Sequence, residues 1–171
     1  PETAVDTETL KVMAECGIDF TILAPWQANV KRELDVTQAY SIQLDAQEKL
    51  KINAFFYHGD ISGRISFDPE LTSNADTFVS DVLAPQYQSA NKRSSDPQLL
   101  LVASDGELYG HHQPFRELFL ERLVNESLEF NDIELVYPEK WLKLYPPKKT
   151  IGIHENTSWS CHHGISRWKE T

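Results

Sequence analysis

The stretch Ile52-Asn53-Ala54-Phe55-Phe56-Tyr57-His58-Gly59-Asp60 contains the more apolar of two neighbouring extended runs. Its first six residues are rich in aromatic and apolar side chains, so they predict a strand. Residues 40–44 predict a second strand, and the polar residues 45–48 predict the turn between the two. Gly59 and Gly63 then interrupt the apolar pattern.

The segment before this pair of strands predicts a helix followed directly by a strand. Asp6 or Thr7 is suited to cap the helix, and Gly17 is suited to end it. The apolar face of this helix consists of Leu10, Met13 and Ala14. Residues 18–24 then predict the strand, since they are rich in residues that favour an extended backbone.

Longer helices are predicted after these strands. In residues 74–88 the apolar side chains recur at helical spacing, which predicts one apolar face. These side chains are Ala75, Phe78, Val79, Val82 and Leu83. Residues 113–130 predict a second long helix, and residues 139–144 a shorter one. The predicted core of the second helix is Phe115, Leu118, Phe119 and Leu123.

Residues 99–103 form an unbroken apolar run, which is typical of a strand buried on both faces of a parallel sheet. Short strands are also predicted over residues 133–136 and 150–153. Strands that alternate with helices indicate βαβ units. The predicted fold class is therefore α/β, with a mostly parallel sheet that is either open or closed into a barrel.

The composition describes one soluble, acidic globular domain. The 171 residues are 40% hydrophobic and 25% charged, and the net charge is −10. This charge argues against a nucleic-acid partner, because such partners are bound mainly through Lys and Arg. The longest apolar run is far shorter than the roughly 20 residues of a membrane-spanning helix, so no membrane partner is expected. Two cysteines and the absence of a signal-like start predict a cytoplasmic protein, and nothing indicates an oligomeric state.

Polar or aromatic residues follow four of the predicted strands. They are Trp26, then His58 and Asp60, then Asp105 and Glu107, and finally Glu155. In parallel α/β sheets, binding and catalytic residues gather beyond the carboxyl ends of the strands. These residues therefore predict an active site, although a single Asp-Gly turn on its own is ordinary turn chemistry.

Asp105 and Trp26 carry the clearest chemistry among these residues. A carboxylate at the end of a buried strand and near another acid is placed for general acid catalysis. Trp26 offers an apolar face on which a sugar ring can stack, and it is equally compatible with a partly buried core indole. Glu2 is a candidate partner acid, and it precedes the predicted start of the first helix.

The histidines do not predict a metal site. His111 and His112 are adjacent, as are His162 and His163, and adjacent side chains point apart on a helix or strand. Zinc sites usually use spaced ligands, which the sequence lacks. No glycine-rich phosphate loop and no acyl-transfer elbow occurs, so no cofactor is expected.

Two segments resemble the catalytic motifs of family-57 glycoside hydrolases. Residues 1–6, Pro-Glu-Thr-Ala-Val-Asp, resemble the nucleophile motif, and residues 104–110, Ser-Asp-Gly-Glu-Leu-Tyr-Gly, resemble the acid/base motif. Further blocks resemble a bacterial branch of that superfamily, known mainly as a domain of unknown function. These blocks are residues 20–25, 56–62, 145–148 and 155–161.

The resemblance implies that residues 1–171 are part of an incomplete (β/α)7 barrel whose first strands precede this sequence. It implies a retaining glycosidase or transglycosidase on α-linked glucan-like saccharides, with Glu2 as nucleophile and Asp105 as general acid/base. Glu107 would contact the oligo- or polysaccharide substrate, as would Trp26, His58, Asp60 and Glu155. This mechanism requires no metal. The alternatives are a metal-dependent carbohydrate deacetylase using His58 and Asp60, and a saccharide-binding relative without turnover.

Overall fold

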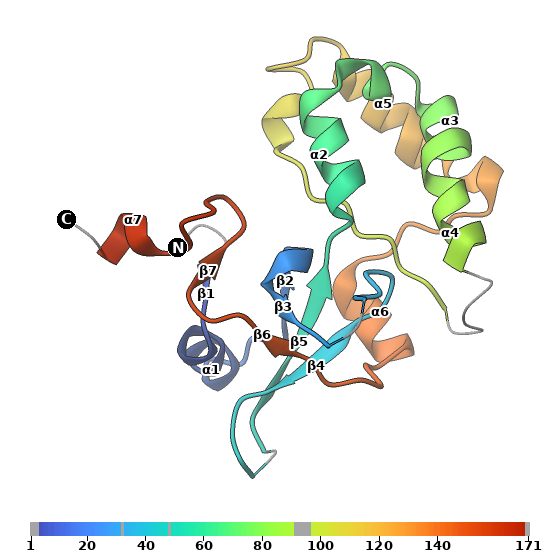
Figure 1. The fold of residues 1–171 in the computed structure, drawn as a ribbon. Helices are drawn as coiled ribbons and strands as arrows, with labels where there is room; N and C mark the ends of the chain where they lie inside the picture. Colours follow the sequence, from blue (N-terminus) through green and yellow to red (C-terminus); the bar gives the residue numbers. More distant parts are fainter. Residues whose placement is uncertain (1–3, 32, 48, 91–96, 170–171) are drawn as a thin grey trace. The chain divides into compact units, whose positions relative to one another are not determined.

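Strand β5 (Lys51–Phe56) is the middle strand of a three-stranded sheet with the order β2-β5-β4 (Figure 1). β2 (Phe20–Leu23) runs parallel to β5, and β4 (Tyr40–Gln43) runs antiparallel to it. Ile52, Ala54 and Phe56 alternate along β5 and are almost fully buried. The three strands predicted in this part of the chain are confirmed.

The computed structural model describes residues 4–31, 33–47, 49–90 and 97–169, without the side chains of residues 88–90, 167 and 168. These residues belong to two compact units. The first unit spans Pro1–His58, Leu99–Leu101 and Leu144–Thr171, and it contains the strands β1 to β7. The second unit spans Gly59–Gln98 and Val102–Lys143, and its described elements are helical.

Helix α1 (Thr7–Glu15) begins and ends as the sequence predicts. Asp6 is the N-cap, and its Oδ1 accepts a hydrogen bond from the Thr9 backbone N–H at 2.7 Å. Gly17 follows with a φ of +79°, a conformation that glycine adopts without strain. Leu10 points into the core and is fully buried.

Two short antiparallel pairs join segments that are far apart in the sequence. β1 (Ala4–Val5) pairs with β7 (Thr157–Ser158), and β3 (Ala28–Asn29) pairs with β6 (Gly152–Ile153). The remaining elements of the first unit are η1 (Pro25–Gln27) and α7 (Ser166–Lys169).

The segment before β6 extends the main sheet. The Ser41 backbone N–H of β4 donates to the Lys149 carbonyl, and the Ile151 N–H donates to the Ser41 carbonyl, both at 2.9 Å. The strand predicted over residues 150–153 is therefore confirmed, as β6 and a parallel bridge at Thr150.

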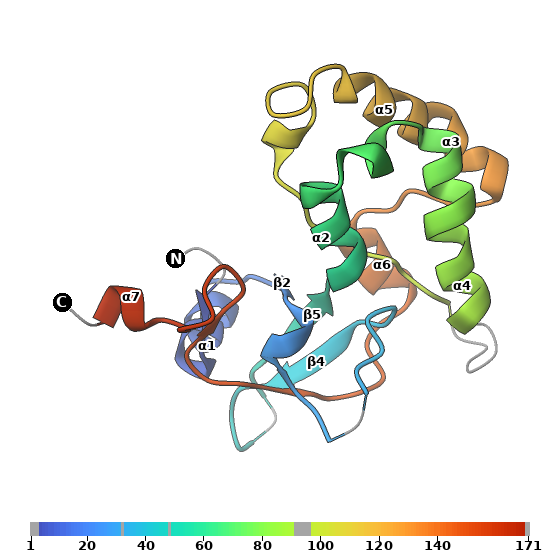
Figure 2. The same ribbon diagram turned by 45° about the horizontal axis from the view of Figure 1, so that its top comes forward.

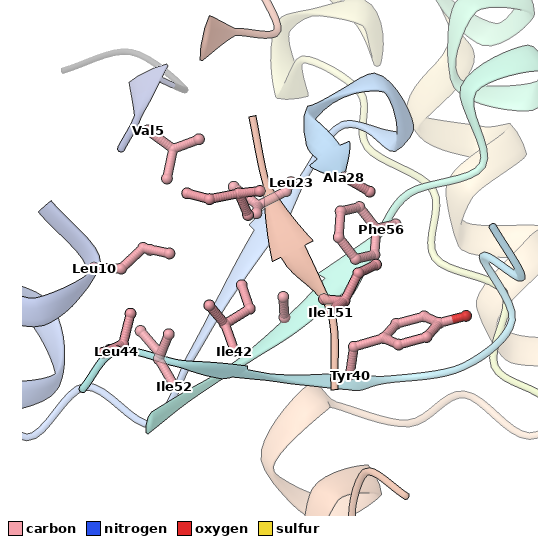
Figure 3. Close-up of a cluster of buried hydrophobic side chains, with 12 residues drawn as sticks. Val5, Leu10, Leu23, Ala28, Tyr40, Ile42, Leu44, Ile52, Phe56 and Ile151 are labelled. Atoms are coloured by element: carbon pink, nitrogen blue, oxygen red, sulfur yellow. The ribbon is translucent and has the colours of Figure 1, made fainter. Parts of the chain in front are cut away.

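One cluster of buried apolar side chains forms the core of the first unit (Figure 3). Its members are Val5, Leu10, Leu23, Ala28, Tyr40, Ile42, Leu44, Ile52, Ala54, Phe56, Ile151 and Ile153. Burial of a large apolar side chain contributes about 1.5–3 kcal/mol. The cluster therefore holds β1, α1 and residues 151–153 against the central sheet.

The second unit contains the predicted helix over residues 74–88, which is confirmed (Figure 2). It consists of α3 (Ala75–Phe78), a π-helical segment η3 (Val79–Leu83) and α4 (Ala84–Ala90). Asn74 caps it by accepting from the backbone N–H groups of Asp76 and Thr77. The other elements are α2 (Gly59–Phe67), η2 (Pro69–Thr72), η4 (Gly106–Leu108), α5 (Arg116–Arg122), η5 (Leu123–Ser127), η6 (Glu129–Asn131) and α6 (Pro138–Leu144), of which only Leu144 is assigned to the first unit.

The helix predicted over residues 113–130 is wrong in its start and at two of its four predicted core residues, while Leu123 is half-buried. The backbone at Phe115 is left-handed, with a φ of +65°, so helix α5 starts only at Arg116. Phe119 is buried as predicted, whereas Phe115 and Leu118 are 73% and 56% exposed. The prediction assumes a continuous helix from residue 113. It is wrong because the backbone at Phe115 lies outside the right-handed helical region.

The strands predicted over residues 99–103 and 133–136 are absent from the described chain. Leu99 N–H donates to the Thr37 carbonyl, and His58 N–H donates to the Leu101 carbonyl, so residues 99–101 bond to two different segments instead of forming a ladder with one strand. Ile133 N–H bonds back to the Leu128 carbonyl, which ends the preceding helical turn. Apolar content alone therefore overestimates strands here.

The α/β class is confirmed, but the strand pairing differs from the prediction. In the described residues β2–β5 is a parallel pair, whereas β4–β5, β1–β7 and β3–β6 are antiparallel. β4 and β5 are joined by a short polar turn, which is compatible only with an antiparallel pair. None of the helices in the described ranges is both long enough and apolar enough to cross a membrane.

Candidate active site

Three aromatic side chains meet at one edge of the first unit. β2 and β5 are parallel, so their carboxyl ends lie at the same edge of the sheet. Trp26 follows β2 and Tyr57 follows β5, and their ring centroids lie 6.0 Å apart in an edge-to-face arrangement. Trp159 follows β7, and its ring lies 5.0 Å from that of Tyr57. We call Trp26, Tyr57 and Trp159 the aromatic group.

The members of the aromatic group differ in exposure. Tyr57 is 8% exposed, and burial raises the pKa of its phenol. Trp26 is 54% exposed, and Trp159 is half-buried. Tyr57 therefore acts as the anchor against which the two indoles pack, and Trp26 keeps apolar ring surface open to solvent.

Sequence reasoning found Trp26 but missed Tyr57 and Trp159. Tyr57 is the last residue of a predicted strand, so its place at the strand end was a usable signal. Trp159 lies in a polar block after the last predicted strand, and only its contact with Tyr57 identifies it.

Gln27 fixes the position of Trp26. It is fully buried, its Oε1 accepts from the Ala24 N–H at 2.9 Å, and its Nε2 donates to Thr157 Oγ1 at 3.2 Å. Its backbone carbonyl accepts from the His154 N–H at 2.8 Å. One buried amide thus ties η1 to the segment that carries β7 and Trp159.

Glu155 and His58 lie in the same unit as the aromatic group. The carboxylate of Glu155 is exposed and accepts from Thr7 through both oxygens, from the backbone N–H at 2.9 Å and from Oγ1. It therefore adds a negative charge at the first turn of α1, where the helix dipole favours one. His58 is half-buried directly after Tyr57.

Gly164 closes the loop that contains Glu155 and Trp159. Its φ is +65°, and a Cβ there would lie 2.3 Å from the Asn156 carbonyl oxygen. Any other residue would force the backbone of this loop to move.

Asp105 lies in the second unit, in the turn before η4. Its backbone carbonyl accepts from the Leu108 N–H at 3.2 Å, while its side chain is exposed and does not cap the turn. Asp60, in the first turn of α2, is also exposed and lies 4.0 Å from Arg64 Nη1. Both acids are thus accessible to solvent.

Glu107 lies beside two histidines in the turn after Asp105. Its Oε2 is 3.2 Å from His112 Nε2 and 4.0 Å from His111 Nδ1. The two imidazole rings stack, with centroids 4.6 Å apart. The expectation that adjacent histidines point apart is wrong for this pair, because the residues lie in a turn and not on a helix or strand.

Glu2 lies outside the described residues. The nearest described element is β1, whose Ala4 pairs with Ser158, the residue before Trp159.

The sequence model of the family described as Glycosyl hydrolase family 57 matches residues 1–154. The chain therefore belongs to glycosyl hydrolase family 57, and the resemblance of its two motifs is confirmed at the level of the family. No curated protein matches the chain.

Two solved structures resemble the fold. A 4-alpha-glucanotransferase from Thermococcus litoralis has a TM-score of 0.60 and 17% identity over 92% of this chain. A novel exo-type maltose-forming amylase from Pyrococcus sp. ST04 has a TM-score of 0.71 and 16% identity over 95% of this chain. The chain spans only 22% and 28% of these two proteins, and at this identity the likeness concerns the fold alone.

Proposed function

We propose that the chain is the catalytic part of a retaining glycoside hydrolase or transglycosidase that acts on α-linked glucans in the cytoplasm, with a fold that belongs to a (β/α)7 barrel. Membership of glycosyl hydrolase family 57 supports the substrate class. The observation that carries the proposal is the aromatic group, because saccharide sites combine aromatic surface with a few polar groups.

In this proposal Asp105 and Glu2 divide the chemistry. Asp105 protonates the glycosidic oxygen while the Glu2 carboxylate attacks the anomeric carbon, so the bond to the leaving sugar breaks as a glycosyl-enzyme forms. Asp105 then takes a proton from water or from a sugar hydroxyl while that oxygen attacks the anomeric carbon, and the bond to Glu2 breaks. Water as the acceptor gives hydrolysis, and a sugar hydroxyl gives transfer. The two carboxyl groups must come within about 5–5.5 Å of each other for this reaction. The exposure of Asp105 supports its role, since a general acid must reach the substrate.

Trp26 supplies the stacking surface in this proposal, with Tyr57 and Trp159 behind it. His58, Asp60, Glu107 and Glu155 supply hydrogen bonds to sugar hydroxyls. The exposed carboxylate of Glu155 supports this role, because each oxygen that binds Thr7 retains a second lone pair.

The test measures cleavage and transfer on maltooligosaccharides with the Glu2→Gln and Asp105→Asn variants. Asp105→Asn is expected to lower kcat by about 10²–10⁴-fold, the usual contribution of acid/base catalysis. Glu2→Gln is expected to lower kcat at least as much, because no glycosyl-enzyme can form without the nucleophile. Matched controls are Glu8→Gln, in the first turn of α1, and Asp132→Asn, an exposed acid in the second unit, and both are expected to retain activity. Unchanged activity in either catalytic variant would remove that residue from its role.

A second measurement separates binding from turnover. Trp26→Ala is expected to raise KM for long maltooligosaccharides, whereas Phe67→Ala, which removes an aromatic ring that is 88% exposed, is expected to leave KM unchanged. Saccharide binding without turnover would instead support the non-catalytic alternative. Acetate release that stops on chelation would support the deacetylase that uses His58 and Asp60.

A further inference from the structure

The geometry points to a transition-metal site formed by Glu107, His111 and His112. This site goes beyond the proposed glycosidase, whose retaining mechanism needs no metal, and it does not depend on that proposal. The ion that fits is a borderline divalent cation such as Zn²⁺, which takes imidazole nitrogen and carboxylate oxygen as ligands.

The distances between the ligand atoms are close to those of such a site. Zn–N and Zn–O bonds are about 2.0–2.2 Å, so ligand atoms around a tetrahedral ion lie roughly 3.3 Å apart. Glu107 Oε2 lies 3.2 Å from His112 Nε2 and 4.0 Å from His111 Nδ1, and the ligand atoms all lie within 4.8 Å of one another. Small rotations of these exposed side chains would close the longer separations.

The local backbone explains why adjacent histidines converge on one carboxylate. Gly110 precedes the pair with a φ of +110°, which residues with a Cβ rarely adopt. The His112 backbone N–H donates to the Glu107 carbonyl at 2.9 Å and closes the turn. His111 and His112 are thereby folded back toward the carboxylate of Glu107.

Three protein ligands would leave a further coordination position for water, as in open zinc sites. A bound ion would also link the side chains of Glu107 and His112, in addition to the hydrogen bond between their backbone groups. Both residues belong to the turn that follows Asp105. We therefore expect the ion to slow opening of this turn.

The test is titration of the metal-free chain with Zn²⁺, followed by calorimetry, and with Co²⁺, followed by its visible absorption. One ion per chain is expected. The double change His111→Ala with His112→Ala should weaken binding at least 10-fold, and Glu107→Gln should weaken it while leaving both imidazoles in place. All three residues are exposed, so these variants are expected to fold.

The chain offers a matched control in its other histidine pair. The rings of His162 and His163 also lie close together, at 3.7 Å, and Cys161 Sγ lies 3.6 Å from His163 Nδ1. The double change His162→Ala with His163→Ala should leave the Zn²⁺ affinity within about 2-fold. Hydrogen exchange of residues 105–113 should slow when Zn²⁺ is added to the unchanged chain.

Three outcomes would overturn the inference. They are no saturable binding of either ion, binding that survives loss of His111 and His112, and binding that is lost instead with His162 and His163. Glu107 is also a proposed sugar contact, so the two proposals are told apart by the Glu2→Gln and Asp105→Asn variants, which test glucan cleavage and leave all three metal ligands in place.

Discussion

Each unit of the chain is stabilised internally by a different kind of interaction. In the first unit, strands and loops from distant parts of the sequence close over one apolar cluster. In the second unit, helices are linked by buried aromatic contacts and by polar side chains. Phe78 of α3 packs edge-to-face on Phe119 of α5 at 5.4 Å, and both oxygens of Asp76 accept from Arg122 at 3.2 Å.

The two units also differ in how many of their large apolar side chains are exposed to solvent. The second unit contains several large apolar residues that are more than half exposed, among them Phe67, Phe115, Leu118, Phe130, Leu135 and Tyr137. The first unit has fewer such residues, and one of them is Trp26 of the aromatic group. Core substitutions should therefore lower the free energy of unfolding most in the first unit.

The largest expected effect comes from the core of the first unit. Phe56→Ala removes a ring that is 1% exposed, and it should lower the free energy of unfolding by about 3–5 kcal/mol. Phe67→Ala, at 88% exposure, is the control and should change it by less than about 0.5 kcal/mol. Urea unfolding measures both variants. Similar losses would show that burial does not control stability here.

A somewhat smaller effect is expected in the second unit. Phe119→Ala removes the partner of Phe78 and should cost about 3 kcal/mol, near the lower end for buried aromatic residues. Leu118→Ala changes the neighbouring, half-exposed position and should cost far less. Hydrogen exchange of each unit measures the effect separately. If Phe119→Ala lowered the free energy of unfolding more than Phe56→Ala, core packing would matter more in the second unit than in the first.

A helix cap in the first unit should have an intermediate effect. Asp6→Ala removes the acceptor for the Thr9 N–H and should cost about 1 kcal/mol. Asp6→Asn keeps an acceptor and should recover most of this loss. Hydrogen bonds from Thr9 lower the pKa of Asp6, so the cap's contribution is complete above the usual Asp range and is lost as the pH falls through the lowered value.

The smallest effect is the pH dependence of the second unit. Hydrogen bonds from Ser127 and Arg122 lower the pKa of Asp76 below its usual value of 3.8. Its stabilising contribution is therefore complete at neutral pH, and it is lost as the pH falls below that value. The difference in Tm between the unchanged chain and Asp76→Asn should accordingly shrink on going from neutral pH to about pH 3. A constant difference would show that the charge of Asp76 does not contribute.

Local sequence signals were sufficient to predict those features of the structure that depend on residues close together in the chain. The cap at Asp6, the end at Gly17 and the apolar face of residues 74–88 follow from short-range hydrogen bonding and helical spacing. Trp26 was found because it follows a strand. Glu2 and Asp105 remain predictions, since they rest on the family motifs and on position in the sequence.

Other features depended on contacts that local patterns do not encode. Residues 99–103 have the composition of a strand but form no ladder, because their backbone groups bond to different segments. The backbone at Phe115 is left-handed, so the helix predicted from residue 113 starts only at Arg116. Trp159 joins the aromatic group only through the pairing of β7 with β1 and its contact with Tyr57.

By itself, the sequence determined the α/β class, the strands around residues 52–57 and the family motifs, because periodicity and residue type act over short distances. Only the tertiary structure decided which strands pair, which aromatic rings meet, and that His111 and His112 face Glu107. Those outcomes depend on long-range packing and on backbone conformation at single residues such as Gly110, which composition and spacing do not specify.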